Sequence, residues 1–248
     1  MIEVRGLQRS FGAHRILDGV SFRIEKGESV VIIGRSGCGK SVLLKHLIGL
    51  LKPDAGEVLI EGENIVGMNE RNLMQVRHRF GMLFQGAALF DSLTVAENIG
   101  FAFRRDRSLS REEVIRKVAE ALEMVDLPGT ESKKPSELSG GMRKRVGLAR
   151  AIVYQPEIVL YDEPTTGLDP IVSDSIDRLI LRVRDRLNVT SVVVTHDMRS
   201  ARRVGHRILM LHDKRVYATG TPEEIFGSQE PVVKQFIEGV SDPKEVYF

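Results

Sequence analysis

The segment that most constrains the fold of this chain is GRSGCGKS, which runs from Gly34 to Ser41. The run SVVII before it predicts a buried strand, and VLLKHLIGLL after it is apolar at helical spacing. A G-x-x-x-x-G-K-[ST] pattern between a strand and a helix is typical of a loop whose backbone N–H groups surround phosphate. Gly34, Gly37 and Gly39 allow the backbone to curl in this way, and the helix N-terminus adds partial positive charge. The segment therefore predicts an α/β fold with a nucleotide-phosphate site.

The other residues of this loop have expected roles. Lys40 would reach the β- and γ-phosphates, and the Ser41 hydroxyl would hold Mg²⁺. Arg35, Ser36 and Cys38 would contribute backbone groups, with Cys38 as a small filler. A Gly-rich turn without a ligand is the alternative, but the strand and helix on either side argue against it.

A second candidate site is IVLYDEP, from 158 to 164, which predicts a buried strand ending in Asp162 and Glu163. Adjacent side chains of a strand point in opposite directions, so one carboxylate could face a metal while the other faces water. We assign Asp162 to Mg²⁺ and Glu163 as the general base for the attacking water. An acidic pair at a helix N-terminus is the alternative.

Composition and charge exclude several classes of protein. The 248 residues carry a formal net charge of +2, too small to indicate a nucleic-acid partner, and the short basic run RKR is typical of a solvated helix face. The single cysteine excludes an internal disulfide and suits a reducing compartment. The N-terminal residues lack the apolar run of a signal peptide, and no apolar run could span a bilayer. We therefore expect a cytosolic chain whose membrane role would come through a partner.

The rest of the chain predicts strands and helices in an α/β order. Ser110 is expected to cap a helix over 111–126, with Glu113 at capping-box spacing. EIVLYDEP and TSVVVTHD predict buried parallel strands. The remaining elements are strands within 1–33, a helix over 42–51, an edge strand over 56–65, a polar helix over 69–78, a hairpin in RILMLHDKRVYATG and short helices over 221–239.

A further Gly-rich element, LSGGM at 138–142, precedes the predicted helix RKRVGLARAI. Together with GRSGCGKS, YDEPTTGLDP and VVVTHD, it closely resembles the ATP-binding subunit of ABC transporters. The resemblance implies a P-loop NTPase (RecA-like) core with an antiparallel β edge subdomain and an inserted helical subdomain. It places the core at 1–85 and 154–220, the insert at 86–153, C-terminal helices at 221–239 and a tail at 240–248. ATP and Mg²⁺ are the implied cofactors.

The resemblance also implies roles for residues outside the phosphate loop. Phe11 stands where the family places an aromatic that stacks on adenine, and Gln85 stands at the glutamine that contacts Mg²⁺ or the lytic water. His196 would contact the γ-phosphate. The residues expected to act across a head-to-tail ATP-sandwich homodimer are Ser139, Gly140, Gly141 and Asp169. One departure is Met142, which replaces the usual glutamine and leaves the usual amide contact in doubt.

The segment GAALFDSLTVAENI after Gln85 is similar to that of Mce/Mla-type lipid transport ATPases. In the family this segment receives the membrane permease, so we expect Gly86 to Phe90 to form a shallow groove for that permease, with Leu89 and Phe90 exposed. A core strand at 86–90, or a staple of the insert to the core, is the alternative. The resemblance implies a lipid transporter with an Mce-type lipid-binding protein, on the cytoplasmic face of the membrane. A transporter of another substrate, or a non-transport ABC ATPase, is the alternative function.

Overall fold

The computed structural model describes residues 1–105 and 108–240. Its internal contacts divide the chain into two compact units, unit 1 with Met1–Asn69 and Val194–Phe248, and unit 2 with Glu70–Val193. The elements that belong to unit 1 are β1 (Ile2–Phe11), β2 (His14–Ile24), β3 (Ser29–Ile33), α1 (Lys40–Leu47), β4 (Ala55–Ile60), β5 (Glu63–Asn64), α7 (Met198–Val204), β9 (Arg207–His212), β10 (Arg215–Gly220), α8 (Pro222–Phe226) and α9 (Pro231–Glu238). Those of unit 2 are α2 (Glu70–Arg77), β6 (Phe80–Leu83), α3 (Val95–Gly100), α4 (Arg111–Met124), α5 (Gly140–Ile152), β7 (Ile158–Asp162), α6 (Pro170–Leu187) and β8 (Thr190–Val194), whose last residue is counted with unit 1. Apart from Val240, the predicted tail at 240–248 lies outside the described residues.

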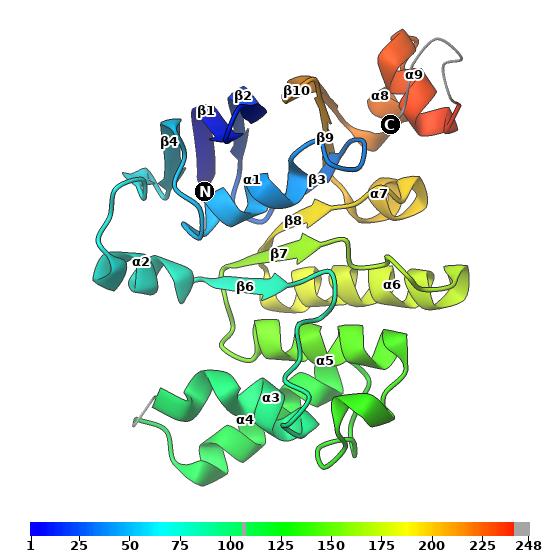
Figure 1. Cartoon of the computed structure of the whole chain (residues 1–248). Helices are drawn as coiled ribbons and strands as arrows, with labels where there is room; N and C mark the ends of the chain where they lie inside the picture. Colours follow the sequence, from blue (N-terminus) through cyan, green and yellow to red (C-terminus); the bar gives the residue numbers. More distant parts are fainter. Residues whose placement is uncertain (106–107, 241–248) are drawn as a thin grey trace. The chain divides into compact units, whose positions relative to one another are not determined.

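Unit 1 contains an antiparallel sheet with the strand order β2-β1-β4-β5 (Figure 1). Ile2 pairs with Ile24 on β2 and with Ile60 on β4, and all three side chains are buried. β1 continues to Phe11, beyond the apolar residues that suggested a strand, because the register shifts near Gly6, whose φ is +56°. A glycine accepts this backbone conformation without steric cost, so the strand bends instead of ending.

The phosphate loop of unit 1 follows β3, whose five residues are all buried. β3 pairs with β9 in parallel, and β9 and β10 form the antiparallel hairpin that the sequence predicts. α1 begins at Lys40 and ends at Leu47, four residues before the end of the predicted helix. Gly49 has a φ of +63° and terminates the helix, although Leu50 and Leu51 continue the apolar run.

Unit 2 is built around α5, which packs against β6, α3, α4 and α6. β6 and β7 pair in parallel, and β7 lies between β6 and β8. In the described part of residues 86–153 we find α3, α4, α5 and two short 3-10 turns, and no strand. The predicted capping box of α4 is confirmed, since the Ser110 hydroxyl accepts from Glu113 N and the Glu113 carboxylate accepts from Ser110 N. A core strand at 86–90 is therefore wrong, because Ala87 and Ala88 adopt φ values of +60° and +48° in a turn.

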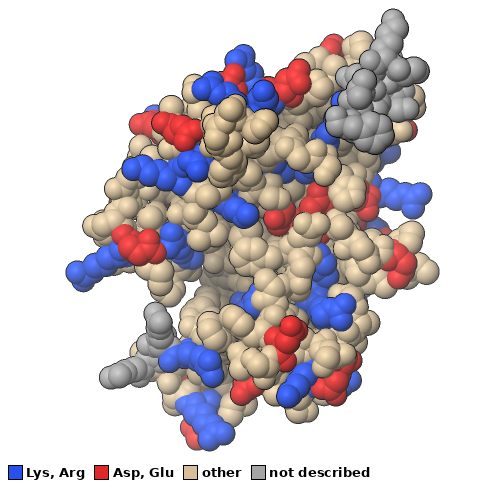
Figure 2. All heavy atoms as spheres, in the orientation of Figure 1, with Lys and Arg blue, Asp and Glu red and all other residues tan. Residues whose placement is uncertain are grey.

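Charged side chains of both signs are interspersed on the face shown in Figure 2. Within unit 2, charged side chains of opposite sign form ion pairs, such as Arg79 with Glu157 and Arg182 with Asp126.

Candidate nucleotide site

The loop from Gly34 to Ser41 has a backbone that requires glycine at defined positions. A Cβ on Gly34 would lie 2.5 Å from Leu211 O and 2.7 Å from Cys38 Sγ, so no side chain fits there. Gly37 and Gly39 have φ values of +78° and +103°, in the region that disfavours other residues. The conformation of this loop could be predicted from the sequence because each of these glycines meets a local steric or backbone requirement.

Lys40 begins α1 and supplies a buried positive charge in this loop. Its side chain is only 7% exposed, and its Nζ donates to Gly34 O at 2.8 Å and to Arg35 O at 3.0 Å. The same loop is closed by Cys38 N, which donates to Arg35 O at 3.2 Å. An ammonium held over a curled backbone at a helix N-terminus is a cradle for phosphate oxygens.

Phe11 and His196 also belong to unit 1. Phe11 ends β1, is 44% exposed, and has the guanidinium carbon of Arg9 4.7 Å from its ring centroid. Arg9 therefore covers one face of the ring in a cation–π contact. His196 is exposed just beyond β8, next to Asp197, whose carboxylate accepts from Arg199 N and Ser200 N at the start of α7.

Asp162 and Glu163 lie at the end of β7, where they are 6% and 8% exposed. The expectation that both lie on the strand is wrong, because β7 ends at Asp162 and Glu163 has a φ of +50°. Their directions are therefore not set by strand alternation. The Glu163 carboxylate instead accepts a hydrogen bond of 3.0 Å from the Thr166 hydroxyl in the following turn.

Lys144 on α5 is a residue that sequence reasoning missed, because its run RKR suggested a solvated face. It is only 6% exposed, and its Nζ donates to the main-chain carbonyls of Gln85 and, at 3.0 Å, Glu163. Burial lowers the pKa of Lys144, while the charges of Asp162 and Glu163 act in the opposite direction. A left-handed residue costs about 1–2 kcal/mol and a hydrogen bond from a charged group contributes about 1.5–3 kcal/mol. The Lys144 bond is therefore large enough to hold Glu163 in this conformation.

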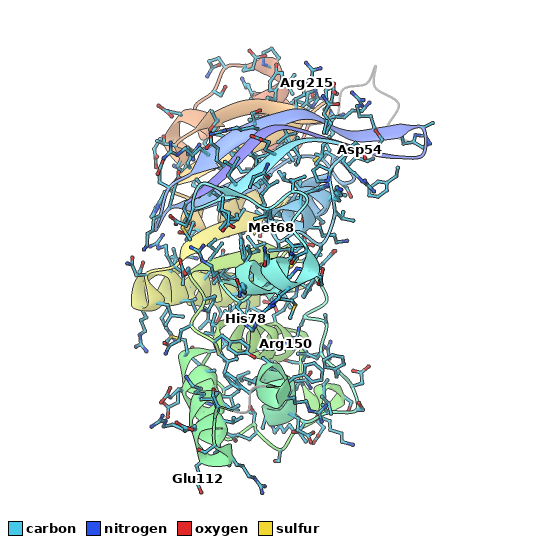
Figure 3. The ribbon with its side chains drawn as sticks, turned by 90° about the vertical axis from the view of Figure 1, so that its left-hand side faces the viewer. Asp54, Met68, His78, Glu112, Arg150 and Arg215 are labelled. Atoms are coloured by element: carbon cyan, nitrogen blue, oxygen red, sulfur yellow. The ribbon has the colours of Figure 1, made fainter. Side chains whose placement is uncertain are left out.

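Gln85 is exposed and precedes a turn that α5 holds at a second point. Arg150, labelled on α5 in Figure 3, donates to Ala87 O at 2.6 Å and to Ala88 O at 2.7 Å. The expectation that Gly86 to Phe90 all face outward needs correction, because Ala87 is 1% exposed and Leu89, which was expected to be exposed, is half-buried. A Cβ on Gly147 of α5 would come within 3.1 Å of the Ala87 Cβ, so a glycine on the helix makes room for this turn.

Phe90 is the exposed end of this segment. It is 44% exposed, and its ring lies 4.6 Å from that of Phe101, which is 39% exposed. The buried Asn98 holds Phe90 by both backbone groups, accepting from Phe90 N at 2.8 Å and donating to Phe90 O at 3.1 Å. Asn98 also donates to Leu93 O and Thr94 O, at 3.2 and 2.9 Å. One buried amide therefore organises the whole turn and leaves the Phe90 ring at the surface.

Ser139 and Asp169 each cap a helix of their own chain. The Ser139 hydroxyl accepts from Met142 N at 3.3 Å at the start of α5. The Asp169 carboxylate accepts from Ile171 N at 2.9 Å and Val172 N at 3.0 Å at the start of α6. A Cβ on Gly141 would lie 2.6 Å from Val172 Cγ1, which explains the glycine by helix packing.

The predicted site residues therefore fall into two groups. Unit 1 holds Phe11, the Gly34–Ser41 loop and His196, whereas unit 2 holds Gln85, Ser139, Gly140, Gly141, Asp162, Glu163 and Asp169. Within unit 2, Lys144 joins Gln85 and Glu163 directly. The part of the chain that the structure describes holds no cluster of three His, Cys, Asp or Glu residues suited to a metal ion. Ser41 of unit 1 and Gln85 and Asp162 of unit 2 each carry an oxygen donor of the type that Mg²⁺ prefers, and Mg²⁺ sites commonly use few protein ligands together with water and substrate phosphates.

Within residues 1–105 and 108–240, every helix is too short or too polar to cross a membrane.

The α/β fold and the phosphate loop define a P-loop nucleoside triphosphatase. The family described as "ABC transporter" matches residues 17–166 of the chain. Over 238 residues the chain is 44% identical to "Probable ribonucleotide transport ATP-binding protein mkl" of Mycobacterium leprae, covering 96% of this chain and 69% of that protein. Over 242 residues it is 40% identical to "Intermembrane phospholipid transport system ATP-binding protein MlaF" of Haemophilus influenzae, covering 98% and 92%. The chain belongs to the ATP-binding proteins of the ABC transporter family, and it binds and hydrolyses ATP.

Solved structures agree with this assignment. A dimeric bacterial ABC transporter cassette is similar with a TM-score of 0.83 and 33% identity, covering 90% of this chain and 99% of that one. A dimeric ATP-binding cassette in a post-hydrolysis state, bound to ADP and Pi, gives a TM-score of 0.81. The predicted fold class and the predicted resemblance to Mla-type lipid transport ATPases are confirmed.

Proposed function

We propose that this chain is the ATP-hydrolysing subunit of a lipid transporter. The observation that carries the proposal is the 40% identity to the phospholipid transport protein MlaF over nearly the whole of both chains. Lipid extraction needs a large energy source, since burying each CH₂ contributes about 0.8 kcal/mol and a sixteen-carbon acyl chain therefore about 13 kcal/mol. ATP hydrolysis is a source of the required size.

The proposed site assigns one task to each side chain. Phe11 stacks on adenine, the backbone of residues 34–39 and Lys40 bind the phosphates, and His196 contacts the γ-phosphate. Ser41, Asp162 and Gln85 would hold Mg²⁺, which supplies charge neutralisation at the phosphates when bound. Glu163 takes a proton from the attacking water while the water oxygen bonds to the γ-phosphorus. The bond between the γ-phosphorus and the bridging oxygen of the β-phosphate breaks, which gives ADP and phosphate.

The residues Ser139, Gly140, Gly141 and Asp169 of unit 2 support the proposal of a head-to-tail homodimer. Ser139, Gly140 and Gly141 form the N-terminus of α5, a suitable anion site for the γ-phosphate of ATP bound to the other copy. Asp169 is the N-cap of α6 and lies beside Ile171, which is 83% exposed. An apolar side chain this exposed suits a contact with a second copy, and similar cassettes are solved as dimers.

The permease is proposed to dock on Phe90 and Phe101, with Arg104 5.3 Å from the Phe101 ring centroid. Two adjacent exposed aromatic rings beside a cation suit an amphipathic helix of a membrane protein. An Mce-type lipid-binding protein would complete the transporter, with this chain on the cytoplasmic face. Residues 86–153 are proposed as the inserted helical subdomain that carries this docking surface, within one ATPase domain at 1–239.

The decisive experiment is purification of the chain from its own cells in detergent. We expect a polytopic permease to co-elute, and the complex reconstituted in vesicles to move phospholipid with ATP. Phe90→Asp should reduce permease recovery at least fivefold, whereas Ile115→Asp, at a 59% exposed isoleucine of α4, should not. Recovery without any permease would contradict the proposal.

The alternative cargo is suggested by the name of the mycobacterial relative, a ribonucleotide transport protein. The same vesicles loaded with radiolabelled ribonucleotide decide between the two. ATP-dependent movement of ribonucleotide and none of phospholipid would replace the lipid proposal.

Glu163→Gln tests the proposed base. We expect ATP binding to persist while turnover falls by two to four orders of magnitude, roughly the range of general base catalysis. Wild-type turnover in this variant would overturn the assignment of Glu163.

A further inference from the structure

Lys144 is a buried cation in the second turn of α5. Its ammonium donates to the carbonyl of Gln85, 59 residues away along the chain, and to that of Glu163, 19 residues away. Lys144 also lies five residues after Ser139, the cap of the same helix. One ammonium therefore connects three of the elements assigned to ATP hydrolysis.

A lysine in this position is costly unless its charge is used. Burying an ammonium group is unfavourable, and a methionine of similar length would fill the same space without that cost. The bonds that Lys144 makes are to main-chain carbonyls, so they constrain backbone positions and leave the side chains of Gln85 and Glu163 available. This arrangement is suited to positioning rather than to direct chemistry.

The two carbonyls belong to residues whose side chains depend on their backbone. Glu163 is left-handed, with a φ of +50°, and its carboxylate accepts from Thr166 in the next turn. Its carbonyl accepts from Lys144 at 3.0 Å and more weakly from Thr166 N at 3.4 Å. Without Lys144, the Thr166 bonds remain, but the link between Glu163 and Gln85 is lost.

We propose that Lys144 is a positioning residue for ATP hydrolysis, which fixes the Glu163 carboxylate relative to Gln85 through their main-chain carbonyls. The inference rests on the proposed role of Glu163 as general base. Lys144 contacts no nucleotide in this assignment, so its loss lowers kcat and leaves nucleotide binding nearly unchanged.

The test measures steady-state ATPase of the full chain, with nucleotide affinity measured separately by a fluorescent ATP analogue. For Lys144→Met we expect a fall in kcat of about 100-fold, the effect typical of a small misplacement of reacting groups. KM and analogue affinity should stay within about threefold, because the phosphate loop is intact. Lys144→Arg keeps donors for both carbonyls, so its kcat should be at least tenfold higher than that of Lys144→Met. The matched control is Lys134→Met, at an exposed lysine of the same unit, and should equal the wild type.

A double variant separates positioning from general destabilisation. In the Glu163→Gln background, Lys144→Met should lower the residual rate by less than about threefold, because the group that Lys144 positions is already absent. An equal loss in both backgrounds would overturn the proposal, as would wild-type kcat in Lys144→Met or a raised KM with unchanged kcat.

Two further results complete the test. Should Lys144→Met not purify as a folded protein, Lys144→Gln replaces it, with an expected loss in kcat of at least fivefold, and failure of both to fold would assign Lys144 to stability and overturn the proposal. Full turnover in Glu163→Gln would overturn the base assignment itself, whereas a slow Glu163→Gln with a fast Lys144→Met would overturn the positioning role alone.

Discussion

Removing the Asn98 side chain should destabilise unit 2 and release the turn that presents Phe90. Asn98 makes hydrogen bonds to four backbone groups of residues 90–94 and has no exposed surface. Two of the four groups keep a second donor in Asn98→Ala, since Phe90 O also accepts from Leu93 N and Thr94 O from Asn98 N. We therefore count about 0.5 kcal/mol for each of these bonds and about 1–1.5 kcal/mol for each of the other two. The expected loss in the free energy of unfolding is about 3–4 kcal/mol.

Urea unfolding followed by circular dichroism measures this loss. With a denaturant dependence of about 3 kcal/mol per molar urea, the midpoint should fall by roughly 1 M. Hydrogen exchange supplies a local reading, because the Phe90 amide should lose its protection. Gln75→Ala, at an exposed glutamine of α2, serves as the control and should change the free energy by less than about 0.5 kcal/mol. A loss below about 1 kcal/mol for Asn98→Ala, with Phe90 still protected, would refute the reasoning.

Three further predictions concern unit 1 and the docking surface. Burial tends to raise the pKa of Glu28, but the bonds from Arg207, the bond from Glu25 N and the charge of Arg207 together outweigh burial and lower the pKa. Glu28 therefore stabilises the fold above its ordinary pKa near 4.3, and that stability is lost as the pH falls through the lower folded value. The difference in unfolding free energy between wild type and Glu28→Gln should thus be constant from about pH 8 to 5 and shrink as the pH falls below the ordinary pKa of a glutamate; a difference that does not shrink on acidification would contradict this. Gly34→Ala should lower ATP affinity at least tenfold in a fluorescent-nucleotide titration, because its Cβ would lie 2.5 Å from Leu211 O, and unchanged affinity would show that the loop can move. Phe90→Ala should leave basal ATPase within about twofold and abolish its stimulation by permease, and retained stimulation would place the docking surface elsewhere.

The features predictable from sequence were those set by local constraints. The loop from Gly34 to Ser41 could be placed because its glycines answer backbone needs within a few residues. The capping box at Ser110 and Glu113 was found for the same reason. Thr94 and Glu97 form the same kind of box at the start of α3, so its T-x-x-E spacing was a signal that could have been used.

The features that sequence reasoning missed depend on distant partners. Lys144 donates to main-chain carbonyls, which every residue has, so the residue types at 85 and 163 could not predict the contact. Asn98 was missed because a buried amide has no periodic signature. The direction of Glu163 was mispredicted because one residue in a left-handed conformation ends strand alternation.

The cap at Ser139 limits which amino acids could serve at that position. The hydroxyl oxygen already accepts from Met142 N, yet a hydroxyl retains a proton to donate. Aspartate would cap α5 equally well but would present only lone pairs, and alanine would do neither. Serine and threonine are the two side chains in which one oxygen atom can both cap its own helix and donate a proton, as the proposed contact with a phosphate requires. The amino acids that could serve at position 139 are therefore limited by the need for a donatable proton as much as by side-chain size.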